Sequence, residues 1–506
     1  MTSASDTTTI AAAQDATRSY RDILRATAVT GGAFVVVLCL SMLRMKMVAL
    51  MLGPNGIGFA GLLTAVLDMV VVVAGLGIQA SGVRQIAEAA GRDDLRSIAS
   101  VVRAVRLASW ATGLAGAGAL VLLALPLSTL TFGTRAHGTD MMVLAMAVLV
   151  RLLAAGQASV LQGTRRIGDL ALINIFGALV TTAAMIPAAY LWGEAGMAWA
   201  LLVASAAHLA VSSWFARKVP LTRWPGWRET RDEFPALLRL GLAFMVSGLV
   251  TFGVAYLVRI IVLREGGIAA AGLYQAAWAV ASLYASFVLQ AMSTDFYPRL
   301  TGLVHDQPGA NRLVNEQAQV SVLLAGPGMI ATITLAPLVL DLFYSPDFAE
   351  AASALRWMCL GMALRLIAWP LGFVVLARGA QGIFFWTEIA AGIVHIGLAL
   401  LLVPVWGTTG AGMAFCGLYV WHAALIYFIV RRYFGFKIDE KTLWLSMESL
   451  GTTGIAFAGV ALLPFWPGTA LGLAVLSWSS LRALRTILPL LPPLEGLQRL
   501  WRMRSG

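Results

Sequence analysis

Residues 59–83 read FAGLLTAVLDMVVVVAGLGIQASGV, and Asp68 is the only charged side chain among them. An apolar run of this length is long enough to cross the roughly 30 Å hydrocarbon core of a bilayer as an α-helix. The run is continuous rather than alternating, which excludes a strand of an outer-membrane barrel. We therefore interpret 59–83 as a transmembrane helix.

Similar runs recur along all 506 residues. Hydrophobic residues make up 59% of the chain and charged residues 12%, about half the roughly 25% of soluble domains. This composition excludes a soluble enzyme and a disordered chain. It predicts an all-α polytopic membrane protein with about fourteen transmembrane helices, at 26–52, 59–83, 101–125, 141–162, 170–191, 196–216, 237–263, 269–294, 318–342, 352–376, 383–403, 409–430, 444–464 and 469–489.

The basic residues alternate between the two sides of this predicted bundle. The chain has 36 Lys and Arg against 25 Asp and Glu, a net charge of +11. The loop 217–235 is basic, whereas the turns 53–58, 192–195 and 404–408 contain no Lys or Arg. Cytoplasmic loops carry the Lys and Arg excess, so both termini are predicted to be cytoplasmic. The charge is spread over several loops, which indicates topology rather than a nucleic-acid partner.

The two halves of the chain resemble each other. Gly56-Ile57 matches Gly267-Ile268 at an offset of 211, and Trp192-Gly193 matches Trp406-Gly407 at an offset of 214. Six spans separate the equivalent positions, and six is even, so the repeats run parallel about an axis near the membrane normal. We expect two pseudo-symmetric six-helix lobes around a central cavity, with two extra helices at the C-terminal end.

This pattern predicts an order of segments along the chain. The tail 490–506 has leucines at 494, 497 and 500 on one helical face and arginines on the other, as in an interfacial amphipathic helix. The predicted segments are a cytoplasmic N-terminal tail 1–25, an N-lobe 26–216, a cytoplasmic inter-lobe linker 217–235, a C-lobe 236–430, the last two spans with their basic loop 431–489, and the tail 490–506.

Four arginines lie inside predicted spans. Arg44 and Arg259 occupy comparable parts of the first helix of each lobe, and Arg151 and Arg365 are related by the repeat. Ionisable groups within a membrane are costly and usually face an aqueous cavity or a partner. The four arginines therefore indicate either a cationic cavity for an anionic substrate, or salt bridges between helices and snorkelling to the interface.

Candidates for ion coupling are scarcer. Asp68 lies near mid-membrane, where it either pairs with Arg44 or exchanges a proton or Na⁺ during transport, and Glu388 is the second candidate. Gln79 and Gln290 lie on faces rich in small residues. Such faces line a cavity or permit close helix packing.

Three aromatic residues are candidates for stacking on sugar rings: Tyr256, Tyr274 and Trp278. Packing and interfacial anchoring are the alternative. No metal-binding spacing, P-loop, nucleophile elbow or HExxH is present, and no large extramembrane loop could hold a catalytic domain. The sequence favours a secondary transporter over an enzyme, with no cofactor apart from a coupling H⁺ or Na⁺.

Three stretches carry a family resemblance: Leu52-Gly53-Pro54-Asn55-Gly56-Ile57-Gly58, Gly77-Ile78-Gln79, and residues 293–300, which read STDFYPRL. They resemble the Wzx-type flippases of O-antigen and related polysaccharide repeat units, in the MATE-like multidrug/oligosaccharidyl-lipid/polysaccharide (MOP) exporter superfamily. The resemblance implies alternating access in the bacterial inner membrane. The substrate would be an undecaprenyl-pyrophosphate-linked oligosaccharide that moves from the cytoplasmic to the periplasmic leaflet.

The same resemblance implies contacts and partners. Arg44 and Arg259 would contact pyrophosphate or acidic sugars in a cationic cavity. The lipid tail would stay among the membrane lipids, and a polysaccharide polymerase or glycosyltransferase would be a partner.

Three alternatives stay open. A MATE-like exporter of cationic drugs would need an acidic cavity, whereas arginines outnumber acids in these spans. A lipid II-type flippase would share the fold and the cationic cavity. A membrane polysaccharide polymerase or ligase would carry a long charged outer loop, and the longest basic loop here is predicted to be cytoplasmic.

Overall fold

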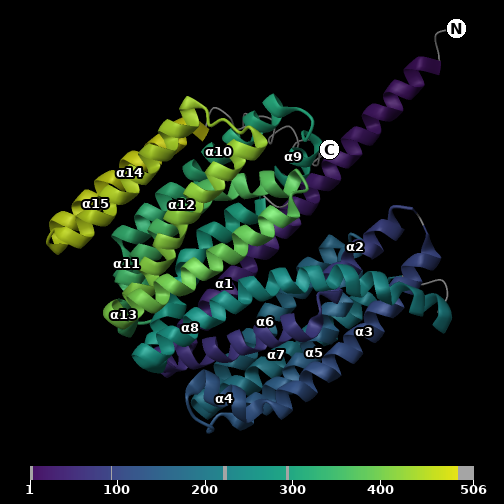
Figure 1. Ribbon diagram of the computed structural model, residues 1–506, viewed down its shortest axis with the longest axis horizontal. Helices are drawn as coiled ribbons and strands as arrows, with labels where there is room; N and C mark the ends of the chain where they lie inside the picture. Colours follow the sequence, from purple (N-terminus) through teal and green to yellow (C-terminus); the bar gives the residue numbers. More distant parts are fainter. Residues whose placement is uncertain (1–3, 93, 220–224, 292–295, 488–506) are drawn as a thin grey trace, which may run out of the picture. The chain divides into compact units, whose positions relative to one another are not determined.

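A computed structural model describes the backbone of residues 4–92, 94–219, 225–291 and 296–487, and the side chains of these segments except 4–30, 284–285 and 287–291. All described elements are helices (Figure 1). The predicted amphipathic helix of the tail 490–506 lies outside the described residues, as do positions 220–224 of the predicted linker.

The chain divides into two compact units, Met1–Tyr256 and Leu257–Gly506. The helices of the first unit pack through a core of aliphatic side chains that includes Ile86, Val102, Val105 and Leu161. Its elements are α1 Ala4–Gly75, α2 Ile78–Ala90, α3 Leu95–Leu122, α4 Ala124–Phe132, α5 Gly138–Gly163, α6 Ile167–Trp192, η1 Gly193–Ala195, α7 Gly196–Ala216 and the first part of α8, Trp227–Ala291.

The second unit contains the rest of α8 and the helices that follow it. In Figure 1, α14 and α15 run side by side as the yellow hairpin at the C-terminal end of the described chain. The elements are α9 Tyr297–Gly302, α10 Gln307–Thr334, α11 Ala336–Phe343, η3 Pro346–Ala351, α12 Ala352–Ala377, α13 Gln381–Phe434, α14 Glu440–Leu462 and α15 Phe465–Ile487.

The described residues contain eight helical segments that are long and apolar enough to cross a membrane. Four of them are 45, 50, 57 and 54 residues long, and each is interrupted at a glycine. A further span comes from α10 and α11, which meet at 90°. With the long segments divided at their glycines and with α15 added, a helix stands at each of the fourteen predicted spans. The predicted all-α membrane fold is confirmed.

The glycine interruptions define the internal repeat. Gly53 (φ 60°, ψ −162°) and Gly267 (φ 78°, ψ −176°) break α1 and α8 in the same conformation. Gly193 and Gly407 both have ψ −137° and φ near 58°. Such positive φ values favour glycine. Both pairs are 214 positions apart, so the offset of 211 read from Gly56-Ile57 was wrong.

The first part of α8 packs within the first unit. Ser100 on α3 donates a hydrogen bond to Glu233 at 2.8 Å, and Arg103 donates to the carbonyl of Pro225. Further along α8, the hydroxyl groups of Tyr256 and Thr131 lie 2.7 Å apart. The boundary between the packed units therefore falls inside α8, between Tyr256 and Leu257. The role of 217–235 as an inter-lobe linker stays a prediction.

The α14–α15 hairpin is tied to α10 by hydrogen bonds. Asn315 donates to the carbonyl of Lys437 at 3.0 Å and accepts from the amide of Asp439 at 3.1 Å. Gln319 donates to Thr442 at 2.7 Å. These bonds hold the first turn of α14 against α10.

Candidate functional site

The first unit contains an ion pair inside the membrane-spanning region. Arg151 on α5 lies 2.8 Å from Asp68 on α1, with 42% and 26% of the two side chains exposed. The sequence left open whether Asp68 pairs with an arginine. The structure gives it one partner on another helix, Arg151 on α5. A carboxylate and a guanidinium at this distance largely neutralise each other.

Breaking this pair is expected to destabilise the protein. In Asp68→Leu the partly buried Arg151 loses its carboxylate, at a cost of about 2 kcal/mol in unfolding free energy. Thermal unfolding in detergent measures the effect. The double variant Asp68→Leu/Arg151→Leu removes both charges, and we expect it to recover most of the loss. If the double variant is as unstable as the sum of the two single variants, the ion pair does not stabilise the fold.

In the second unit, the arginine equivalent to Arg151 has different neighbours. With the offset of 214, Arg151 corresponds to Arg365 on α12, and Asp68 corresponds to Ser282. The Arg365 guanidinium lies 4.4 Å from the ring centroid of Trp369 and 5.5 Å from that of Tyr419. Its Nε is buried and donates no hydrogen bond to a described residue. An aromatic pair, rather than a carboxylate, thus surrounds this cation.

Two titratable side chains of α13 lie within electrostatic range of Arg365. They are Glu388 and His422. Neither makes an ion pair or hydrogen bond with Arg365 among the contacts of the described residues. The ring nitrogens His422 Nδ1 and His395 Nε2 are buried and also lack a described partner. This region therefore holds a cation, an acid and unused hydrogen-bonding groups.

Aromatic rings extend the cluster towards α8. Phe415 lies 4.9 Å from Tyr419 and 5.2 Å from Trp278, measured between ring centroids. Trp278 in turn stacks near Tyr274 at 6.4 Å. The two predicted sugar-stacking residues on this helix are thus packed against other rings, and Tyr274 is buried. A role for them in binding sugar stays a prediction.

Arg259 also has a polar partner in the second unit. Its Nε donates to Gln275 Oε1 at 3.0 Å. The two residues stand on opposite sides of the break at Gly267. The break lets the chain bring a cation from one part of α8 to an amide on the next.

The remaining predicted site residues are more scattered. Arg44 on α1 and Gln79 on α2 are half-buried. Tyr256 is buried, with its hydroxyl bonded to Thr131. The side chain of Gln290 lies outside the described residues. Assignments of these residues to a substrate site stay predictions.

Sequence reasoning missed two members of the Arg365 cluster. Trp369 follows Arg365 by four residues, which places both on one helical face. That spacing was a usable signal, because arginine commonly stacks on aromatic rings. Tyr419 comes from α13, and no spacing along the chain could have placed it beside Arg365.

A protein-family profile described as "Polysaccharide biosynthesis protein" matches residues 47–353. The chain belongs to this family. A curated relative, the lipid III flippase of Escherichia coli K12, is 23% identical over 394 residues, which cover 75% of this chain and 91% of that protein.

Two solved structures share the fold. One is the lipid II flippase MurJ in an inward closed conformation, with a TM-score of 0.69 at 14% identity, over 92% of this chain and 100% of that chain. The other is an inward-facing multidrug resistance MATE family transporter of the MOP superfamily, with a TM-score of 0.65 at 17% identity, over 83% and 95%. The predicted resemblance to polysaccharide flippases is confirmed by the family profile and by the lipid III flippase, and the two solved structures share the fold. These relatives are flippases and transporters rather than catalysts of a chemical reaction.

Proposed function

We propose that this multi-pass member of the polysaccharide biosynthesis family is a flippase for a lipid-linked oligosaccharide. The substrate is an undecaprenyl-pyrophosphate-linked repeat unit, which moves from the cytoplasmic to the periplasmic leaflet of a bacterial inner membrane. Both termini are cytoplasmic, in keeping with the distribution of Lys and Arg. The coverage of nearly the whole lipid III flippase of E. coli supports this proposal.

The unequal surroundings of two repeat-related arginines carry the proposal. Arg151 is paired with Asp68, whereas Arg365 has Ser282 at the corresponding position and makes no ion pair with a described residue. A guanidinium stays charged even in a low dielectric, so Arg365 needs an anion when its region closes to water. Phosphate oxygens match a guanidinium bidentately. A pyrophosphate group would supply that anion.

Arg259, in the same unit as Arg365, is a second proposed contact for the anionic groups of the substrate, and Arg44 in the first unit is proposed separately as a third. The Nε of Arg259 donates a hydrogen bond to Gln275 Oε1 at 3.0 Å. Each of these arginines would contact the pyrophosphate or an acidic sugar during transport.

We propose Glu388, rather than Asp68, as the residue that couples transport to protons. Asp68 is held by Arg151 at 2.8 Å, whereas Glu388 faces Arg365 without an ion pair. In the proposed cycle, protonated Glu388 leaves Arg365 free to bind pyrophosphate. Deprotonated Glu388 competes with the phosphate for the same cation and favours release.

This mechanism predicts a specific defect in Glu388→Gln. The amide mimics the protonated acid, so substrate binding is expected to persist while acceleration of transport by a pH gradient disappears. Transport in proteoliposomes with and without an imposed gradient measures this. Glu440→Gln, at the exposed start of α14, is the matched control. An unchanged gradient dependence in Glu388→Gln, or a dependence on Na⁺ alone, would contradict proton coupling through this residue.

The proposed function is tested by depleting the protein and extracting membrane lipids for mass spectrometry. A sugar-specific lectin on intact spheroplasts reports the leaflet. We expect one undecaprenyl-linked glycan to accumulate on the cytoplasmic side. Accumulation on the periplasmic side would instead indicate a polymerase or ligase, and normal levels and sidedness would exclude a flippase. Pull-down from the same cells tests the proposed polymerase or glycosyltransferase partner.

A further inference from the structure

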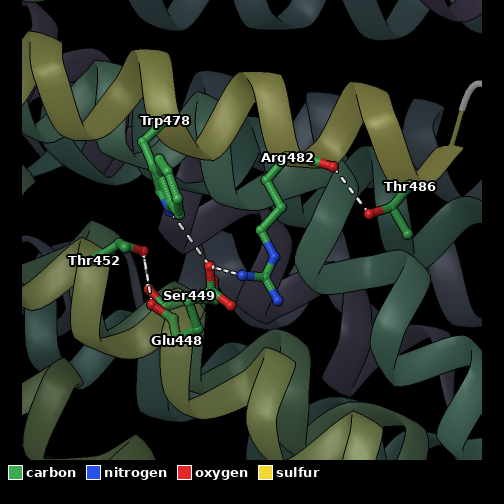
Figure 2. A network of polar contacts seen from close by, with 6 residues as sticks. All are labelled: Glu448, Ser449, Thr452, Trp478, Arg482 and Thr486. Carbon is green, nitrogen blue, oxygen red and sulfur yellow. Dashed lines mark hydrogen bonds and ion pairs between the residues drawn. The ribbon is translucent and has the colours of Figure 1, made fainter.

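The hairpin of α14 and α15 contains a further ion pair between helices, Arg482 with Glu448. Figure 2 shows Glu448 on α14 beside Arg482 and Trp478 on α15. Glu448 Oε1 accepts a hydrogen bond from Arg482 Nη1 and another from Trp478 Nε1 at 3.4 Å. Both contacts use the same carboxylate oxygen. Within the described chain, Oε2 and the remaining Arg482 donors make no hydrogen bond.

A small cavity lies at this pair. Its volume is about 30 Å³, and it is lined by α10, α14 and α15, with polar groups from Glu448, Ser449, Thr452, Trp478, Ser479 and Arg482. A cavity of roughly 10–15 Å³ holds one water. The space therefore fits an ammonium or another small polar group.

The pair stands near one end of the hairpin. Glu448 follows the start of α14 at Glu440 by eight residues, or about 12 Å, and Arg482 precedes Ile487, the last described residue of α15, by about 8 Å. Lys441 and Arg485 occupy the same end. Trp478 is 61% exposed, and tryptophan concentrates at the membrane interface. These features place the pair at the boundary between lipid headgroups and hydrocarbon.

The chemistry of the pair selects a particular kind of headgroup. The side chains of Arg482 and Glu448 are 42% and 25% exposed, so both remain accessible. Together they form a neutral dipole, and a zwitterion aligned against it places a phosphate on the guanidinium and an ammonium on the carboxylate. A primary ammonium supplies three donors, as lysine does. A choline headgroup supplies none, and a glycerol headgroup supplies no cation.

We propose that Glu448, Arg482 and Trp478 form a binding site for a bilayer phospholipid with a primary-amine zwitterionic headgroup, of the phosphatidylethanolamine type. The phosphate binds Arg482, and the ammonium binds Glu448 at the cavity. The acyl chains lie along exposed apolar side chains of α15 that precede Arg482 and so lie deeper in the hydrocarbon, Leu473 and Leu481. This site is separate from the proposed glycolipid site around Arg365, because it lies on the added hairpin.

Native mass spectrometry of the full-length protein in detergent tests the site. Palmitoyl-oleoyl phosphatidylethanolamine, phosphatidylcholine and phosphatidylglycerol are titrated separately, without any glycolipid substrate. We expect the first to bind about tenfold more tightly than the other two, which corresponds to one charge-assisted hydrogen bond. Glu448→Gln and Arg482→Gln are expected to remove this preference. Arg485→Gln, one turn from Arg482 and outside the cavity, is the matched control and is expected to keep it.

Three results would overturn the proposal. Equal affinity for the three lipids would mean that the ion pair only joins α14 to α15. Loss of thermal stability in Glu448→Gln with the lipid preference retained would mean the same. Displacement of phosphatidylethanolamine by an equimolar amount of undecaprenyl phosphate would assign the site to the carrier lipid instead. Because no transport is measured, each result stands independently of the flippase proposal.

Discussion

Replacement of Arg365 by alanine is expected to lower glycan export about 100-fold, because the loss of a bidentate guanidinium–phosphate contact costs roughly 3 kcal/mol. The cation sits against Trp369 and Tyr419 with a buried Nε that lacks a described partner. The aromatic rings hold the guanidinium plane, so its unused donors stay available to an anion. Transport of the lipid-linked glycan into lectin-accessible form, at matched protein levels, measures the loss.

The repeat supplies the control for this substitution. Asp68→Leu/Arg151→Leu removes the equivalent arginine together with its counter-charge, and we expect export to fall by less than tenfold. Arg365→Lys keeps the charge but loses the planar fork, so it is expected to retain only part of the activity. Normal export by a well-expressed Arg365→Ala variant would show that this arginine is not a substrate ligand.

The Gly77→Ala substitution is expected to destabilise the protein by about 3 kcal/mol or more, because steric overlap and left-handed strain act together. Gly77 precedes α2 with φ 62°, and an added Cβ would lie 2.1 Å from the carbonyl oxygen of Gly241 on α8. That oxygen belongs to backbone and cannot rotate away. Chemical or thermal unfolding of the purified protein in detergent measures the change.

Substitutions at two other glycines measure the steric overlap and the left-handed strain one at a time. Gly133 has φ 74°, and an added Cβ would meet open space. We therefore expect Gly133→Ala to lower the unfolding free energy by about 1 kcal/mol, from backbone strain alone. Gly241→Ala is helical, and its Cβ would lie 2.5 Å from the carbonyl oxygen of Leu76, so it carries only the overlap. We expect Gly77→Ala to exceed both. If Gly77→Ala is no worse than Gly133→Ala, close contact between these two backbones is not needed for stability.

The positions of the spans followed from the sequence because each transmembrane helix forms from hydrogen bonds within its own segment. In a bilayer an apolar run of about 20 residues must form hydrogen bonds with all of its own backbone N–H and C=O groups, and only a helix does so within one segment. Residues 59–83 therefore predicted a helix without reference to any neighbour. Composition and the absence of catalytic motifs likewise indicated a transporter.

The internal repeat was visible, and the match of Trp192-Gly193 to Trp406-Gly407 gave its offset of 214, but the register of the first helix of each lobe was not visible. Isolated Gly-Ile matches gave an offset of 211, whereas the backbone conformations of Gly53 and Gly267 fix it at 214. A two-residue match carries little information, and a broken helix is defined by dihedral angles rather than by residue type. The corrected register aligns Asp68 with Ser282. It therefore shows that Arg151 has a carboxylate partner where Arg365 has a serine at the equivalent position.

The sequence by itself determined where the chain crosses the membrane, which ionisable residues lie inside it and that the two halves are related. Tertiary structure alone decided how those charges are used. Asp68 and Arg151 are paired although they stand on different helices, and Arg365 meets Tyr419 from α13. The physical reason is that helical periodicity fixes which face a side chain occupies, whereas packing between helices fixes what that face meets.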